Sequence, residues 1–191
     1  NILSKLSKDK FSLELFEIIF PQLKQFKYFL KPNQFAKDKL DEADFIFLLS
    51  LLIVDRSDNA DYFMFKYNIS KKDKKRLRLI NNFYSEKITA KLFSEKNLNK
   101  MFYYYGKQAV IDILSYKLFI TKKIDKNLVD LVEVYKSKVL PTMPVGAKIL
   151  ISKYKIPEGK TLGNKLKLIE EEWVNNDFKL TEKQIDEIIN Y

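Results

Sequence analysis

Carboxylates are the only side chains here with the means for metal-dependent chemistry, because the sequence contains no histidine and no cysteine. Imidazole base catalysis, thiolate nucleophiles, disulfides and thiolate zinc sites are therefore excluded. Group transfer by two metal ions requires carboxylates held close together on a rigid element. Asp55 and Asp58 lie close together in the sequence DRSDN, but that composition predicts a turn rather than a metal site. With no P-loop or Rossmann fingerprint either, we expect this chain to be catalytically inert by itself.

The densest positive charge lies at the start of a predicted helix over residues 70–84. Cations at the amino-terminal end of a helix oppose its dipole, so this placement costs stability that a bound anion would offset. The formal charge of +10 agrees with an anionic partner. A merely solvated face is the alternative, and a coding bias toward lysine also explains part of the excess. The candidate side chains of this segment are Lys71, Lys72, Lys75, Arg76 and Arg78.

A second candidate site lies in the sequence KYKIPEGKTLGNKL, residues 153–166. A Pro-x-Gly turn that feeds a helix leaves backbone N–H groups free beside basic side chains. Such a turn is able to hold a nucleic-acid phosphate without reading the base sequence. The alternative is an ordinary corner between two helices, in which the glycines only permit close packing. The candidate residues here are Lys153, Lys155, Gly159, Lys160 and Lys165.

The elements that carry these residues are predicted to be helices throughout, which makes the fold all-α. Only four glycines and five prolines occur, and the apolar residues recur at helical spacing. Residues 44–54 are apolar nearly all round and predict a helix at the centre of the core. A first helix over residues 7–20 is predicted with Ser7 as its N-cap. Its apolar face consists of Phe11, Leu15, Ile18 and Ile19.

Most of the glycines and prolines gather in residues 140–163, which predicts a subdomain boundary. We therefore expect a multi-helix body over residues 1–140 and a smaller helical tail over residues 141–191. The last helix of the body is predicted over residues 126–139, with an apolar stripe of Leu128, Leu131, Val132, Tyr135 and Val139. In the tail, a stripe of apolar residues at 162, 166 and 169 predicts that Trp173 lies in the core. Thr181 and Gln184 form a capping-box pattern before the last helix.

The segment IPEGKTLGNKLKLIEEEWVNNDF, residues 156–178, resembles a motif of bacterial class II CCA-adding enzymes and the related poly(A) polymerases. In that family a Pro-x-Gly-x-x-Leu-Gly turn precedes a helix that ends in tryptophan, and an acidic residue and a phenylalanine follow. The matching residues are Pro157, Gly159, Leu162, Gly163, Leu166, Glu171, Trp173, Asp177 and Phe178. A preceding part of the motif matches at Pro144 and Leu150 only. Near the other end, residues 6–20 resemble the family's neck motif at Ser7, Glu14 and Leu15.

The resemblance implies that this chain is the end of the neck, the body and the tail of a tRNA nucleotidyltransferase. Those parts are expected to hold the acceptor stem and T-arm of tRNA, and the basic residues above then become candidate RNA-binding residues. The catalytic head, which uses Mg²⁺ with ATP and CTP, would precede Asn1 and would contact this chain. Because the first residue is not methionine, we expect the sequence to begin within a longer protein.

Two other interpretations stay open at this stage. The same tail occurs in poly(A) polymerases, so the RNA substrate of the parent protein is not fixed. The second interpretation belongs to a different functional class, in which the chain is a helical scaffold that binds proteins. An exposed apolar patch would favour this interpretation. No apolar run approaches the roughly 20 residues of a membrane span, and we expect a cytoplasmic protein.

Overall fold

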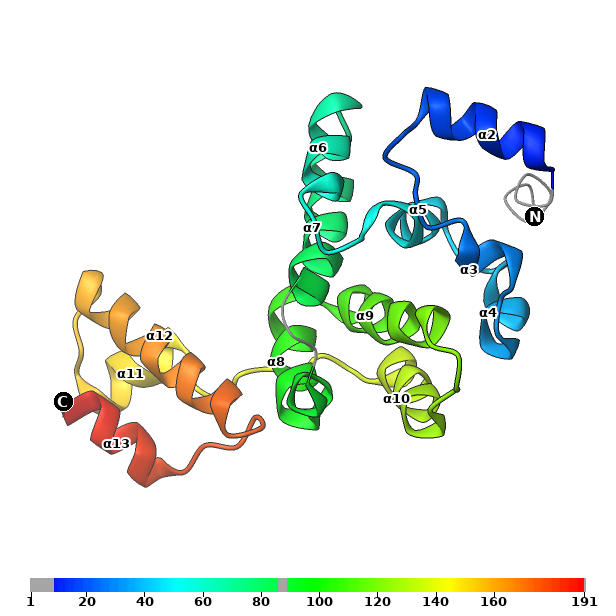
Figure 1. Cartoon of the computed structure of the whole chain (residues 1–191). Coiled ribbons are helices and arrows are strands. Elements are labelled where there is room, and N and C mark those ends of the chain that lie inside the picture. Colours follow the sequence, from blue (N-terminus) through cyan, green and yellow to red (C-terminus); the bar gives the residue numbers. More distant parts are fainter. Residues whose placement is uncertain (1–8, 86–88, 191) are drawn as a thin grey trace. The chain divides into compact units, whose positions relative to one another are not determined.

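The computed structural model describes residues 9–85 and 89–190 of the chain. Within these ranges every regular element is helical, with 12 α-helices, one short 3₁₀-helix and no strand (Figure 1). The predicted all-α fold is thereby confirmed.

Two compact units make up the chain, and both are discontinuous in sequence. The first unit comprises residues 1–89 and 107–138, and the second comprises residues 90–106 and 139–191. The helices of the first unit are α2 (Lys10–Ile19), α3 (Lys27–Leu30), α4 (Gln34–Lys39), α5 (Phe45–Ile53), α6 (Asn59–Lys66), α7 (Lys71–Ser85), α9 (Lys107–Ile120) and α10 (Lys126–Ser137). Those of the second unit are η1 (Ala90–Phe93), α8 (Glu95–Tyr105), α11 (Ala147–Tyr154), α12 (Lys160–Asn175) and α13 (Glu182–Asn190).

This division differs from the sequence-based one in the segment over residues 90–106. The sequence placed that segment in the body, whereas in the structure α8 packs against α12 of the second unit. The pairing joins parts of the chain that are far apart in sequence, so no local composition signal marks it.

Helix α5 lies at the centre of the first unit, as its nearly uniform apolar composition predicts. It packs against α6, α7 and α9, and α9 packs against α10. Helices α5, α7 and α9 contribute many of the fully buried side chains of this core, among them Leu51, Ile53, Leu77, Ile80, Val110, Ile113, Leu114 and Leu118. The helix predicted over residues 70–84 is confirmed as α7, and its buried residues include Leu77, Ile80 and Tyr84.

Buried polar side chains connect parts of the first unit through hydrogen bonds to backbone carbonyls. The Tyr84 hydroxyl donates to the Ile113 carbonyl (2.6 Å), and the Tyr116 hydroxyl donates to the Val54 carbonyl (3.0 Å). The Asn59 side-chain amide donates to the carbonyls of Ile53 (2.7 Å) and Gln22 (2.9 Å). The bonds to Ile53 and Val54 satisfy carbonyls at the end of α5 that have no partner within the helix.

Helix α2 differs from its prediction in two respects. Its N-cap is Asp9, whose carboxylate accepts from the Ser12 N–H, while the predicted cap Ser7 lies outside the described residues. None of its residues is buried, and the predicted apolar face is exposed to solvent. The amphipathic pattern was recognised, but no described element covers that face.

The second unit has a core of two adjoining groups of apolar side chains. Leu150, Leu162, Ile169 and Ile185 pack between α11, α12 and α13. Farther along α12, the ring of Trp173 meets Tyr103 of α8 edge-on, with ring centroids 5.4 Å apart, and it also contacts Phe178 at 5.0 Å. Trp173 is 2% exposed, which confirms its predicted place in the core.

The structure also tests local predictions for residues 126–191. The capping box is confirmed, because the Thr181 N–H donates to the Gln184 side chain (2.9 Å) and the Gln184 N–H donates back to the Thr181 hydroxyl (3.3 Å). The prediction for Val139 is wrong: α10 ends at residue 137, and Val139 is 83% exposed. The helix α11 was not predicted, because the surrounding glycines and prolines hid its short apolar repeat.

We expect Trp173→Ala to lower the free energy of unfolding by roughly 3–5 kcal/mol, because it removes a large buried ring from between α8 and α12. Urea denaturation followed by circular dichroism measures the change. Leu168→Ala is the matched control on the same helix, since Leu168 is 45% exposed, and its cost should stay below about 1 kcal/mol. Equal losses in the two variants would contradict the packing described for Trp173.

Candidate nucleic-acid interface

The first basic cluster lies on the opening turns of α7, where Lys71, Lys72 and Lys75 are exposed. Ser70 directly precedes the helix, and its hydroxyl accepts from the Asp73 N–H (3.2 Å) and donates to the Asp73 carboxylate (2.7 Å). The last turn of α7 carries no basic residue. Its cations are thus concentrated at the end where the helix dipole disfavours them.

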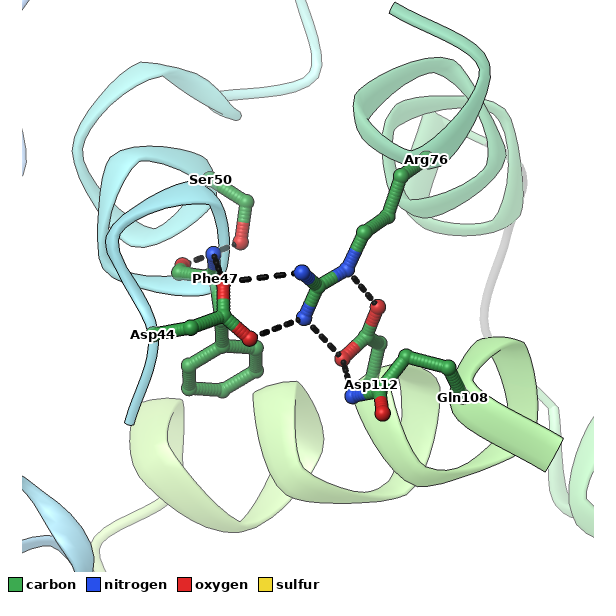
Figure 2. Close-up of polar contacts among 6 residues, drawn as sticks. All are labelled: Asp44, Phe47, Ser50, Arg76, Gln108 and Asp112. Atoms are coloured by element: carbon green, nitrogen blue, oxygen red, sulfur yellow. Dashed lines mark hydrogen bonds and ion pairs between the residues drawn. The ribbon is translucent and has the colours of Figure 1, made fainter. Parts of the chain in front are cut away.

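Arg76 belongs to the same predicted cluster but is engaged by two carboxylates (Figure 2). Its Nε–H and Nη2–H donate to the Asp112 oxygens at 2.5 and 2.8 Å. Its Nη1–H and Nη2–H donate to the Asp44 oxygens at 2.8 and 2.6 Å. Gln108 adds a further hydrogen bond to Asp112 (2.9 Å). A phosphate would have to displace one of these bidentate pairs to reach Arg76. The role of this guanidinium is therefore to stabilise the folded structure.

Burial and ion pairing act against each other in this group. Burial raises the pKa of the Asp112 carboxyl, and hydrogen bonds from Arg76 and Gln108 offset that rise only in part. Burial also raises the pKa of Asp44, but the hydrogen bonds from Arg76 and the Phe47 N–H outweigh it, and the net shift is downward. The pKa of Arg76 is raised well above its ordinary value: burial lowers it, and the bonds to Asp112 and Asp44 raise it by more. Asp112 therefore depends on Arg76 to stay ionised inside the unit.

Arg78, two residues farther on, stands in a different environment. Its Nε lies 3.6 Å from an oxygen of Asp61, and both side chains are more than half exposed. An exposed pair at this distance is weak and exchanges readily for another anion. Arg78 is thus available to a ligand, whereas Arg76 is not.

The second basic cluster surrounds the turn between α11 and α12. Lys155 follows α11 in the left-handed conformation (φ 56°), and Gly159 caps α12 at φ 135°, a conformation that residues with a side chain rarely adopt. The predicted role of Gly159 in a tight turn into the helix is confirmed. Lys155 and Lys160 are exposed on either side of this turn.

The other two lysines predicted at this turn have partners of their own. Lys153 forms an ion pair with Glu182 of α13 (3.1 Å) in which both side chains are exposed. Lys165 is half-buried, and its ammonium donates to the Ile188 carbonyl (2.8 Å). Lys165 therefore fixes the end of α13 to α12, while Lys153 is free to exchange its partner.

Charge is distributed along α12 against the preference of a helix dipole. Lys160, Lys165 and Lys167 occupy its first half, and three glutamates at positions 170–172 occupy its second half. Two of these glutamates have partners: Glu170 accepts from the Tyr103 hydroxyl, and Glu172 accepts from the Asn176 side chain (2.7 Å). The acidic half thus helps to hold the second unit together, and the basic half is left beside the Gly159 turn.

The end of the motif that suggested a family also forms one structural feature. Asp177 and Phe178 adopt left-handed conformations (φ 51° and 64°), and the Phe178 N–H donates to the Trp173 carbonyl (2.8 Å). Asn99 of α8 lies 3.4 Å from the Asp177 carboxylate. The acidic residue and the phenylalanine therefore terminate α12 and fold the chain back over Trp173.

Sequence reasoning missed Asp44 and Asp112, the two partners of Arg76. The available signal was a lone carboxylate at an inward-facing position of the otherwise apolar stretch AVIDILS, residues 109–115. Such a residue requires a buried cation, and α7 supplies it.

Over residues 9–85 and 89–190, no three or more acidic side chains are grouped so that they would hold a metal ion. No described helix combines the length and apolar character needed to cross a membrane.

Comparison with known proteins adds no relative: no protein-family model, no curated protein and no solved structure matches this chain.

We expect Arg76→Ala to lower the free energy of unfolding by about 3–5 kcal/mol at neutral pH, because it leaves Asp112 charged, buried and unpaired. Arg78→Ala is the matched control on the same helix and should cost at most about 1 kcal/mol, since its pair is exposed. Chemical denaturation of both variants makes the comparison, and a small loss for Arg76→Ala would contradict the role assigned to it.

The deficit of Arg76→Ala should shrink as the pH falls below neutrality. Without Arg76, the pKa of Asp112 in the folded chain rises further above its unfolded value, so the folded state takes up a proton that unfolding releases. Acidification then stabilises the variant relative to wild type. Denaturation curves at several pH values test this, and a deficit independent of pH would argue against an unpaired Asp112.

Proposed function

We propose that this chain is the RNA-holding part of a tRNA nucleotidyltransferase, and that its helical units grip the acceptor stem and T-arm of tRNA through phosphate contacts. The observation that carries the proposal is the pair of exposed lysine clusters, one in each unit, each at the amino-terminal end of a long helix. Cations at those positions reduce the stability of the free protein, and an RNA phosphate would reverse that effect.

The chemistry of the two clusters suits a structured RNA. Double-stranded RNA is recognised largely by shape and by contacts to phosphates and 2′-hydroxyls, rather than through base edges. Lysines suit this task because each neutralises a phosphate and releases counterions without demanding one fixed geometry. The proposed contacts are Lys71, Lys72, Lys75 and Arg78 in the first unit and Lys153, Lys155 and Lys160 in the second. Arg76 and Lys165 are left out, because the protein's own groups hold them.

The resemblance at residues 156–178 supports the choice of parent protein. The residues that match the family motif are the ones that shape the second unit here: Gly159 permits the turn, Trp173 fills the core, and Phe178 closes over it. In this proposal the nucleotidyl transfer itself, with Mg²⁺, ATP and CTP, belongs to a catalytic head upstream of Asn1. A poly(A) polymerase parent is the variant of the proposal that adds adenylate alone.

A second candidate function is favoured by the exposed apolar face of α2. Phe11 and Ile18 are each more than 70% exposed there, as expected for a surface that docks on another protein. In this alternative the chain is a helical scaffold and the lysines are a solvated face.

The RNA proposal predicts that the chain binds a tRNA-like duplex with an affinity that falls steeply as salt rises. Replacing Lys71, Lys72 and Lys75 together by alanine should weaken binding and reduce the slope of log K against log salt by up to about three. Replacing Lys153, Lys155 and Lys160 should do the same for the second unit. Fluorescence anisotropy over a salt series gives both quantities.

Lys122, Lys123 and Lys126 provide the matched control, because they carry the same total charge and are exposed outside both clusters. Their replacement by alanine should change the slope much less. Equal effects for all three triple variants would mean that net charge alone drives binding. Absence of salt-dependent binding by wild type would favour the scaffold alternative.

A further prediction concerns catalysis. The chain alone should incorporate no nucleotide into tRNA when it is supplied with Mg²⁺, CTP and ATP, since the proposal assigns the metal-binding carboxylates to the catalytic head. Incorporation is measured with labelled nucleotides, with a complete nucleotidyltransferase as the positive control. Activity of the purified chain that survives further purification would overturn this assignment of the chemistry to an upstream head.

A further inference from the structure

Helix α6 presents two aromatic rings to solvent. Phe65 is 83% exposed and Tyr62 is 53% exposed, while Ala60, Phe63 and Met64 form the buried face of the same helix. Tyr62 and Phe65 are three residues apart, so their side chains are neighbours on one helical face. A phenylalanine ring left in water forgoes the free energy of burial, and its exposure beside a second ring marks a surface that lacks its partner.

A stripe of basic side chains on α7 lies next to these rings. Helix α6 packs beside α7, and Asp61, which precedes Tyr62, is 3.6 Å from Arg78 and 3.3 Å from the Asn81 side chain (Figure 1). Lys71, Lys75 and Arg78 follow one another at helical spacing and are all exposed, so they form one edge of α7. Rings and cations thus share one surface within the first unit.

From this juxtaposition we infer that the α6–α7 surface, defined by Tyr62, Phe65, Lys75 and Arg78, binds unpaired nucleotides of an RNA. The rings stack on the bases, and the two cations neutralise the adjoining phosphates. This inference rests on the proposed RNA-binding function and adds a second kind of contact to it, because the lysine clusters by themselves contact only the backbone.

Charge complementarity is what commits the surface to RNA. Aromatic rings interleaved with cations are the usual composition of single-strand binding surfaces, where stacking and phosphate neutralisation act together. The weak, exposed pair between Arg78 and Asp61 is easily exchanged for a phosphate. An apolar protein partner would instead have to desolvate Lys75 and Arg78 without replacing their hydration.

The test compares two RNAs that share one hairpin stem, the first blunt-ended and the second with a short unpaired 3′ extension of adenosines. Wild-type chain should bind the extended RNA about tenfold more tightly, which corresponds to stacking of one base or two. The double variant Tyr62→Ala/Phe65→Ala should lose most of that preference and keep its affinity for the blunt hairpin, because phosphate contacts do not involve the rings. Both substitutions are exposed and place alanine in a helix, so the fold should be retained, and circular dichroism verifies this.

Phe11→Ala is the matched control. Phe11 is a similarly exposed ring (74%), but its helix α2 carries a single lysine, Lys10, in place of a stripe of cations. This variant should discriminate between the two RNAs as wild type does.

The failures of the two proposals are distinguishable. If wild type binds both RNAs equally, the inference about unpaired nucleotides is overturned and the duplex-binding function stands. If it binds neither, both are overturned. Loss of self-association or of binding to anionic lipid vesicles in the Tyr62/Phe65 variant, with RNA discrimination unchanged, would assign the surface to that other partner and would also overturn the inference.

Discussion

Asp112 is a carboxylate on the buried side of α9, and the arrangement of the first unit depends on how its charge is neutralised. A charge in that position is tolerated only when a cation with matched geometry reaches it. Arg76 does so from α7 and at the same time holds Asp44, which caps α5 through the Phe47 N–H. One guanidinium therefore fixes three helices against each other. Together with the buried face of Leu77, Ile80 and Tyr84, it holds α7 so that Lys71, Lys75 and Arg78 stay exposed.

In the second unit, aromatic side chains hold the helices together. Tyr103, Trp173 and Phe178 meet at the end of α12, and the glutamates of that helix bond to α8 and to the residues that follow the helix. These contacts engage two glutamates in the second half of α12, whereas Lys160, at its first turn, stays exposed beside the Gly159 turn. In α7, then, the stabilising ion pairs of Arg76 and the exposed cations lie on different faces of the same turns, and in α12 the bonded glutamates and the exposed Lys160 lie in different halves of the helix. That separation is expected when a charged surface is retained for binding rather than for stability.

How far the sequence predicts this structure depends on whether the cause is local. Gly159, the Thr181 capping box and the core position of Trp173 follow from backbone conformation and helical spacing, so they were predictable. The partners of Arg76 were not, because proximity of Asp44, Arg76 and Asp112 arises only when three helices pack. The exposed face of α2 shows a second kind of failure. Its amphipathic pattern correctly predicts a helix, but the pattern does not reveal whether another element covers the apolar face. Among the candidate binding residues, sequence alone likewise did not separate Arg78, which is available, from Arg76 and Lys165, which are not.

The interrupted sequence of the second unit has a consequence for how the chain is made. Tyr103 of α8 and its partner Glu170 are 67 residues apart, and the residues between them include two helices of the first unit. At a synthesis rate of about 5–20 residues per second, α8 leaves the ribosome on the order of ten seconds before α12 is available to cover it. During that interval its apolar side chains are open to chaperones and to misassociation. The interrupted sequence also means that recombination at residue 140 would not exchange a complete unit. Any replacement of the tail would have to pack against α8, which is encoded far upstream.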